Sequence, residues 1–237
     1  FSDLIQLCKQ RNIKIIEDAA GALGTKYTEG KFKNKFAGTI GDLGCISFNG
    51  NKIITCGGGG MILTNNKDFA KKSLHLSTQA STDKFTYTHD DVGYNYRLTN
   101  IQAAVGLAQL EKIENFLKIK KKINKFYLAN LKNIKDLEYN NKPNYASNNC
   151  WMLSISLKNK NINFKNKVIK SLLNNGVETR SIWKPLHLQK PYKMFQNYKV
   201  SNSEKVFNNT LNLPSSTNLK SSDLKKILAT VKKVCKN

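Results

Sequence analysis

Residues 45–63, CISFNGNKIITCGGGGMIL, place one lysine, Lys52, between two apolar runs and follow it with four glycines. The flanking runs GDLGCISF and GGMILTNN are typical of short strands bounded by turn residues. Glycines at residues 57–60 favour a turn with close backbone approach. A chain with 39 lysine and arginine residues does not need a buried position for one more cation, so the stretch indicates a special role for Lys52.

The alternation of strands and helices predicts the fold class. NIKIIEDAA is typical of a strand, DFAKKSLHLS of a helix, and residues 98–133 carry apolar residues at helical spacing with Thr99 or Asn100 as the N-cap. Further on, CWMLSISL and VETRSIW are predicted strands, and NINFKNKVIKSLLNNG and SSDLKKILATVKKV predicted helices. This order favours α/β layers in residues 1–125 and a smaller α+β domain in residues 126–237.

The overall composition excludes several classes of protein. With 237 residues and 40% hydrophobic residues, the chain is expected to be globular. No apolar run approaches the roughly 20 residues that cross a bilayer, so no membrane partner is expected.

Residue 1 is Phe within a run that predicts a helix already under way, which indicates a fragment lacking its beginning.

The five cysteines form no CxxC pair, and none has metal-ligand spacing to the three histidines. This pattern favours a reduced, cytoplasmic compartment and argues against a metal site.

The formal net charge of +23 allows two interpretations. A basic protein can bind nucleic acid or another polyanion, which would be a non-catalytic function. The lysines, however, are scattered among asparagines and isoleucines instead of forming one stripe with aromatic residues. We therefore expect no nucleic-acid partner, and an anionic small-molecule substrate would still be steered toward such a surface.

Lys52 is a candidate reactive amine. An amine is nucleophilic only when unprotonated, and the apolar neighbours Ile46, Phe48, Ile53 and Ile54 would desolvate it. Ser47 offers a hydroxyl for an anionic group. The alternative is an ordinary solvated lysine, and the glycine run alone is not the GxxxxGK[ST] phosphate loop.

Asp18 ends the strand of KIIEDAA, where α/β sheets place their ligands. In a pyridoxal phosphate enzyme an Asp pairs with the protonated pyridine nitrogen, whereas an ordinary strand-terminal Asp caps the next turn. The stretch HDDVGYNYRLTN, which precedes the long helical span, could bind a ligand or only pack a turn.

Four stretches in one order, IIEDAAGALGTKY, GTIGDLGCISFNGNKIITCGGGGMILTNN, DVGYNYRLTNIQAAVGLAQLEKI and RSIWKPLHLQKPY, carry a resemblance over nearly the whole chain. The chain resembles the DegT/DnrJ/EryC1/StrS family of pyridoxal phosphate-dependent sugar aminotransferases. The resemblance implies the aspartate aminotransferase-like fold, with a large α/β domain containing a mainly parallel sheet and a small C-terminal α+β domain.

The resemblance also implies roles for individual residues. Lys52 matches the lysine that bonds to the cofactor and acts as general acid and base, and Asp18 the partner of the pyridine nitrogen. Ser47 matches a ligand of the cofactor phosphate. Asn95 matches a residue that reaches the neighbouring subunit's cofactor phosphate, with Arg97 beside it, which implies a homodimer with shared active sites. Trp183 and His187 match a segment near the sugar-nucleotide cleft.

The wording SFNGNKIIT.GGGGMI is most similar to the branch that aminates UDP-linked 4-keto-6-deoxy-N-acetylhexosamines for bacillosamine or legionaminic acid, with glutamate as amino donor. A dTDP-linked keto sugar is the alternative substrate. A relative that uses pyridoxamine phosphate for dehydration would carry His in place of Lys52.

Two departures from the family stand out. Gly21 replaces a Gln or Glu that commonly lies near the cofactor, so another residue is expected to supply that contact, or it is absent. The family's N-terminal part, with its phosphate turn and its ring-stacking aromatic residue, has no counterpart in these 237 residues.

Overall fold

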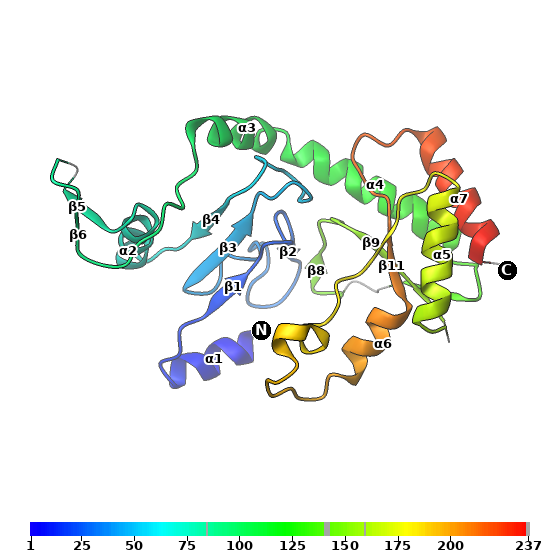
Figure 1. Cartoon of the computed structure of the whole chain (residues 1–237), viewed down its shortest axis with the longest axis horizontal. Coiled ribbons are helices and arrows are strands. Elements are labelled where there is room, and N and C mark those ends of the chain that lie inside the picture. Colours follow the sequence, from blue (N-terminus) through cyan, green and yellow to red (C-terminus); the bar gives the residue numbers. More distant parts are fainter. Residues whose placement is uncertain (84, 140–142, 159, 236–237) are drawn as a thin grey trace. The chain divides into compact units, whose positions relative to one another are not determined.

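The computed structural model describes residues 1–83, 85–139, 143–158 and 160–235. The chain divides into two compact units, Phe1–Leu117 with Lys142–Trp151, and Lys118–Asn141 with Met152–Asn237. The division lies within helix α4 (Ile113–Leu131), which also contains the domain border predicted between residues 125 and 126. That border stays a prediction. Each unit combines helices with a sheet (Figure 1).

The sheet of the first unit has the order β1-β3-β4, with β1 (Ile16–Asp18), β3 (Leu43–Ser47) and β4 (Gly60–Leu63). β1 and β3 are parallel, whereas β3 and β4 are antiparallel. The three strands predicted in this part of the chain are confirmed. Because β1 and β3 are parallel neighbours, their carboxyl ends meet at one edge of the sheet.

The helices of the first unit begin at clear caps. The Asn66 side chain accepts hydrogen bonds from two backbone N–H groups at the start of α2 (Lys67–Ser77). Thr99 caps α3 (Asn100–Leu110) in a capping box with Gln102, which confirms one of the two predicted caps. The predicted long helical span is two helices, α3 and α4. The first helix, α1 (Ser2–Gln10), precedes β1.

Two small strand pairs complete the first unit. β2 (Lys26–Tyr27) pairs with β8 (Ala146–Ser147), and β5 (Ser81–Asp83) pairs with β6 (Thr88–His89). The β2–β8 pair returns the segment Lys142–Trp151 to the first unit. A buried core cluster of this unit consists of Ala19, Ile46, Phe48, Ile53, Ile54 and Cys56.

The second unit contains an antiparallel sheet of order β10-β11-β9-β7. Its strands are β7 (Leu137–Tyr139), β9 (Leu153–Leu157), β10 (Arg180–Ser181) and β11 (Thr210–Leu213). The helices are α5 (Ile162–Asn174), α6 (Ser201–Asn209), α7 (Ser221–Cys235) and two short 3-10 helices, η1 (Leu186–Leu188) and η2 (Lys190–Tyr192). A hydrophobic core of residues from α4, α5, α7 and the sheet holds this unit together. The α+β character predicted for this part of the chain is confirmed.

The described helices include none that is long and apolar enough to span a bilayer. Likewise, within the described ranges no group of three or more His, Cys, Asp or Glu side chains could hold a metal ion.

Candidate active site

The two carboxylates that end β1 have different environments. Glu17 accepts hydrogen bonds from the backbone N–H groups of Gly38 (2.9 Å), Ile40 (2.6 Å) and Gly41 (2.6 Å), and so fixes the turn before β3. Asp18 is exposed, and its Oδ1 accepts one hydrogen bond, from Ala20 N at 3.1 Å. The Glu17 carboxylate is therefore used by backbone hydrogen bonds. The Asp18 carboxylate accepts one bond from its own turn and is otherwise exposed at the carboxyl end of β1.

Ser47 and Lys52 follow from the neighbouring strand. Asp18 pairs in register with Cys45 of β3, and Ser47 ends that strand two residues later. Side chains alternate along a strand, so Asp18, Cys45 and Ser47 share one face of the sheet. The Ser47 Oγ accepts a hydrogen bond from Asn49 N (3.3 Å), and Lys52 N donates to Asn49 O (3.0 Å), which forms the turn that carries Lys52.

The apolar residues near Lys52 in the sequence are mostly buried. Phe48, Ile53 and Ile54 are buried, with Ile54 only 1% exposed. Beyond them, the Gln109 side chain of α3 pairs with both backbone groups of Thr55, accepting from its N–H (3.1 Å) and donating to its carbonyl (2.8 Å). Lys52 itself is half-buried.

Two local features of the backbone explain why glycine is needed at positions 59 and 60. Gly59 adopts a φ of 82°, a left-handed conformation that glycine adopts without strain. At Gly60, a Cβ would lie 2.4 Å from the carbonyl oxygen of Ile46, so β4 can approach β3 only without a side chain there. The run therefore shapes the return from the Lys52 turn into β4.

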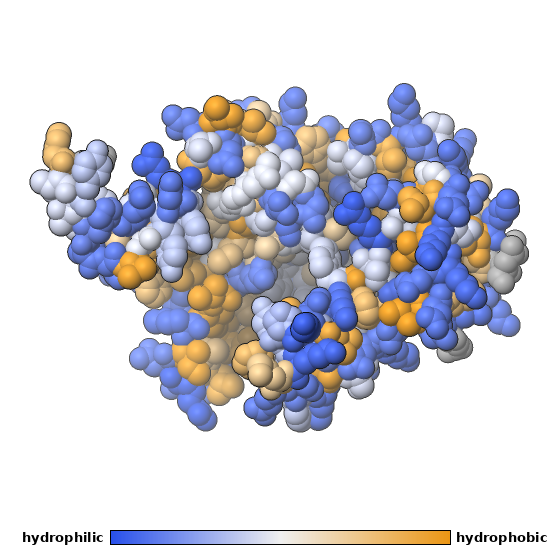
Figure 2. Space-filling model, viewed as in Figure 1, coloured by the Kyte–Doolittle hydropathy of each residue, from blue (hydrophilic) through white to orange (hydrophobic). Residues whose placement is uncertain are grey.

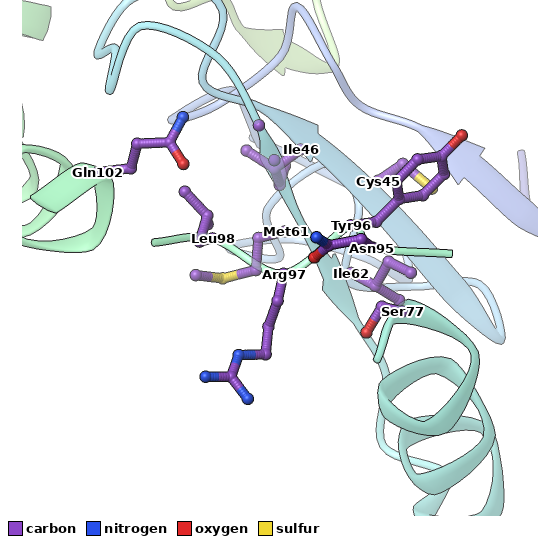
Figure 3. Close-up of a pocket in the computed structure, with 12 residues that line it drawn as sticks. Cys45, Ile46, Met61, Ile62, Ser77, Asn95, Tyr96, Arg97, Leu98 and Gln102 are labelled. Carbon is purple, nitrogen blue, oxygen red and sulfur yellow. The ribbon is translucent and has the colours of Figure 1, made fainter. Parts of the chain in front are cut away.

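Asn95 and Arg97 line a pocket of about 500 Å³ next to β4 (Figure 3). Asn95 forms an isolated β-bridge with Thr78 after α2. Arg97 is exposed, and Figure 3 shows its guanidinium extended away from the β4 ribbon. Cys45, Ile62 and Gln102 are among the other lining residues; Lys52, Asp18 and Ser47 are not. Cys45, which pairs with Asp18, therefore connects this pocket with the sheet face that carries Asp18 and Ser47.

Trp183 and His187 belong to the second unit. The His187 Nε2 lies 2.9 Å from the Glu204 Oε1 of α6, which holds the η1 turn, and the His187 side chain is 14% exposed. Trp183 is 65% exposed. The structure gives His187 a packing role within its own unit and leaves the Trp183 indole at the surface.

Sequence reasoning missed Trp151. The Lys52 Nζ lies over the Trp151 ring, 4.0 Å from its centroid, and the indole Nε1 donates to Asn51 O at 2.6 Å. The sequence pattern assigns Trp151 to a strand that in fact begins at Leu153. The one available signal was the unusual Gly21, because a Cβ there would lie 2.7 Å from the Trp151 ring.

The chain is similar to known proteins both in its sequence and in its structure. The model of the DegT/DnrJ/EryC1/StrS aminotransferase family matches residues 1–232. GDP-perosamine synthase of Escherichia coli is 37% identical over 187 residues, which cover 79% of this chain and 49% of the relative. A UDP-4-amino-4,6-dideoxy-N-acetyl-beta-L-altrosamine transaminase of Campylobacter jejuni is 35% identical over 129 residues, 54% of this chain and 33% of the relative.

Among solved structures, a Streptococcus pneumoniae protein assigned to the sugar aminotransferases and solved in its PLP form superimposes with a TM-score of 0.84. Its identity to this chain is 25%, and the match covers 97% of this chain and 60% of the other. The chain spans about half the length of the first curated relatives it matches.

Proposed function

Because this chain belongs to the DegT/DnrJ/EryC1/StrS aminotransferase family, we propose that it is part of a pyridoxal 5′-phosphate-dependent aminotransferase that aminates a nucleotide-linked keto sugar. The chain has the aspartate aminotransferase-like fold of its structural neighbours. The single observation that supports the activity most directly is the placement of Asp18 and Ser47 at the ends of adjacent parallel strands, with Lys52 on the turn that follows.

The chemistry of these three side chains fits the cofactor. A carboxylate suits the protonated ring nitrogen, an amine suits the aldehyde, and a hydroxyl suits the phosphate. Asp18 would hold the ring nitrogen, Lys52 would bond to the aldehyde carbon, and Ser47 would donate to the phosphate. When bound, the cofactor supplies an electron sink for the carbon that gains or loses the amino group.

The chain's own residues supply positioning and proton transfer. Lys52 Nζ would hold and move the proton at the reacting carbon, acting as the general acid and base. Phe48, Ile53 and Ile54 would exclude water behind it. The net charge of +23 would raise the encounter rate of the anionic nucleotide without setting its specificity.

For the substrate, we propose a UDP-linked 4-keto-6-deoxy-N-acetylhexosamine and glutamate as the amino donor, in a cytoplasmic pathway of surface-glycan synthesis such as that of bacillosamine or legionaminic acid. The motif wording around Lys52 and the name of the Campylobacter relative support this proposal. A GDP-linked sugar is the second candidate, because the Escherichia coli relative is a GDP-perosamine synthase. Trp183 and His187 remain our candidates for the sugar-nucleotide cleft.

We further propose that the active protein is a homodimer in which Asn95, with Arg97, reaches the partner's cofactor. Both residues line a pocket whose lining does not include Lys52, which suits a contact with a cofactor held by another subunit. Sedimentation of the protein that contains this chain should give a dimer at assay concentrations. Catalysis by a monomer at those concentrations would contradict the shared site.

Covalent labelling tests the aminotransferase proposal. The cofactor-loaded protein is reduced with borohydride and digested, and the peptides are mapped. Lys52 should carry the label, and Lys52→Ala should bind cofactor without being labelled and be inactive. The exposed Lys35 serves as matched control, since Lys35→Ala should label and turn over like the parent. A label on another lysine, with Lys52→Ala still active, would overturn the assignment.

A panel of keto sugars tests the substrate. With glutamate as donor, amination of the UDP-linked N-acetyl sugar should exceed that of the dTDP-linked and GDP-linked sugars by at least about tenfold in kcat/KM, or about 1.4 kcal/mol. Preference for the GDP-linked sugar would favour the second candidate. Turnover of none of them, together with tight binding of a polyanion such as heparin, would favour the non-catalytic interpretation of the basic charge.

A further inference from the structure

Three contacts place the indole of Trp151 at the Lys52 turn. The Lys52 Nζ lies 4.0 Å from the ring centroid, within the range in which an ammonium group is attracted to an aromatic face. The indole Nε1 donates to Asn51 O at 2.6 Å, which fixes the backbone of the residue just before Lys52. One side chain therefore constrains both the backbone of the turn and the terminal amine that the turn carries.

The third contact explains Gly21. A Cβ built on Gly21 would lie 2.7 Å from Cζ3 and 2.9 Å from Cε3 of Trp151, closer than real Cβ atoms come. Gly21 does not adopt a left-handed φ, so its lack of a side chain answers a need for space and not for an unusual backbone. The ring occupies the volume into which a longer side chain at position 21 would extend.

Asn149 holds the backbone of Trp151 close to the segment that contains Gly21. Its Nδ2 donates to the carbonyl oxygens of Gly21 (2.9 Å) and Leu23 (3.0 Å), and its Oδ1 accepts from Trp151 N (3.0 Å). Asn149 is 3% exposed, so these bonds lie within the body of the first unit. The buried Asn149 side chain therefore links the backbone of Trp151 to the backbone of Gly21 and Leu23.

We propose that Trp151 is a positioning residue for Lys52, and that Gly21 and Trp151 form a matched pair, because the ring needs the space that a side chain at position 21 would fill. The ring face determines where the Lys52 amine lies before the cofactor binds, and the Nε1 bond determines the orientation of the turn. This inference rests on the proposed function, because positioning matters only if Lys52 is the reacting amine.

Fluorescence of the cofactor-free protein tests the contact without catalysis. The chain has two tryptophans, so in a Trp183→Phe background Trp151 is the only indole emitter of this chain. Lys52→Met should shift the Trp151 emission and change its acrylamide quenching constant by at least about twofold, since the group over the ring face is replaced. Lys35→Met, at an exposed lysine of the same unit, should change neither value. Unchanged emission in Lys52→Met would overturn the proposal.

The rate at which borohydride-trapped cofactor accumulates on Lys52 tests the positioning role. Trp151→Leu should slow it about tenfold, because a misplaced amine reaches the aldehyde less often. Trp151→Phe keeps an aromatic face and should recover part of the rate. Gly21→Ala, which pushes the ring aside, should also slow trapping, whereas Gly106→Ala, where a Cβ meets only ordinary contacts beyond 3.4 Å, should not.

The two arms separate the possible failures. If Trp151→Leu keeps its melting temperature and traps cofactor at the parent rate, the positioning role is wrong even though Lys52 reacts. If the parent protein traps cofactor on a lysine other than Lys52, the proposed function fails, and with it the positioning role. In that case the fluorescence arm still decides whether the Lys52–Trp151 contact exists.

Discussion

At the residue scale, identical chemical types have different roles because of their partners. Glu17 and Asp18 are neighbours with the same functional group, yet three backbone N–H groups occupy Glu17. Asp18 is left exposed at the sheet edge with one local bond. Lys52 and Lys165 also differ: Lys52 lies half-buried over an aromatic ring, whereas Lys165 is 1% exposed and donates to Ser181 Oγ and Phe207 O. Burial lowers the pKa of Lys165.

Tyr139, the last residue of β7, provides a prediction about pH. Its hydroxyl is buried with no hydrogen-bond partner among the described residues. Burial raises the pKa of Tyr139 to about 12, because the phenolate would lose its hydration. We expect Tyr139→Phe to raise the free energy of unfolding near neutral pH by about 1–2 kcal/mol, since the unpaired hydroxyl no longer has to be desolvated.

The sign of the pH dependence follows from the raised pKa. An unfolded tyrosine releases its proton near pH 10, whereas folded Tyr139 holds it to about 12, so the folded state binds more protons in that window. Stability is therefore lost as pH rises from about 10 to about 12, and the loss should be smaller in Tyr139→Phe. Urea titrations across this range measure it, with Tyr198→Phe, 77% exposed, as control. Equal alkaline losses in Tyr139→Phe and the parent would contradict the prediction.

At the element scale, local signals explain where helices start but not what covers them. The Thr99 capping box begins α3 as the sequence indicates, and the chain turns at Glu111 and Lys112 to start α4. The apolar face of α3 is largely uncovered in the structure, with Ile101 80% and Val105 44% exposed. Figure 2 shows hydrophobic residues at the surface where Figure 1 places α3. Helical periodicity identifies such a face without identifying its neighbour.

The cap of α3 can be tested directly. Thr99 Oγ1 accepts from Gln102 N (3.3 Å), and Gln102 Oε1 accepts from Thr99 N (3.2 Å). Thr99→Ala should lower the free energy of unfolding by about 0.5–2 kcal/mol, because the backbone N–H of Gln102 in the first turn loses its acceptor. Thr99→Ser keeps the hydroxyl and should lose much less. Urea denaturation provides the measurement, and equal losses in the Ala and Ser variants would show that the cap is not responsible.

At the scale of the whole molecule, the chain does not divide at one point in the sequence. Segment Lys142–Trp151 returns to the first unit, where β8 pairs with β2 and Thr28 Oγ1 donates to Asn144 O at 2.8 Å. This return brings Trp151 to Lys52, some 100 residues away in the sequence. The domain border predicted between residues 125 and 126 assigns the same segment to the second domain.

Removal of the Asn149 amide should weaken the attachment of segment Lys142–Trp151 to the rest of the first unit. Asn149→Ala leaves the carbonyls of Gly21 and Leu23 without their donor in a buried place, at a cost of about 1–3 kcal/mol. Hydrogen exchange should accelerate in peptides that cover residues 20–27 and 143–151, and should stay unchanged in α5. Asn144→Ala, at an exposed side chain of the same segment, should leave the pattern as in the parent. Acceleration confined to α5 would refute this account.

The sequence by itself determined the local elements and the chemically distinctive positions. Strand and helix spacing predicted β1, β3, β4 and the main helices, since these signals come from residues within one or two turns of each other. The motifs around Lys52 and Asp18 predicted the family, which the match over residues 1–232 confirms. The roles of the individual site residues stay predictions: Lys52, Asp18, Ser47, Asn95, Arg97, Trp183 and His187.

Only the tertiary structure decided which distant residues meet. The need for glycine at position 21 is not visible locally, because its φ is ordinary and the obstacle is an indole 130 residues further along. The preference between Glu17 and Asp18 likewise depends on a turn at residues 38–41. Contacts of this kind depend on how the chain returns on itself, and pairing across such separations leaves no periodic signal in the sequence.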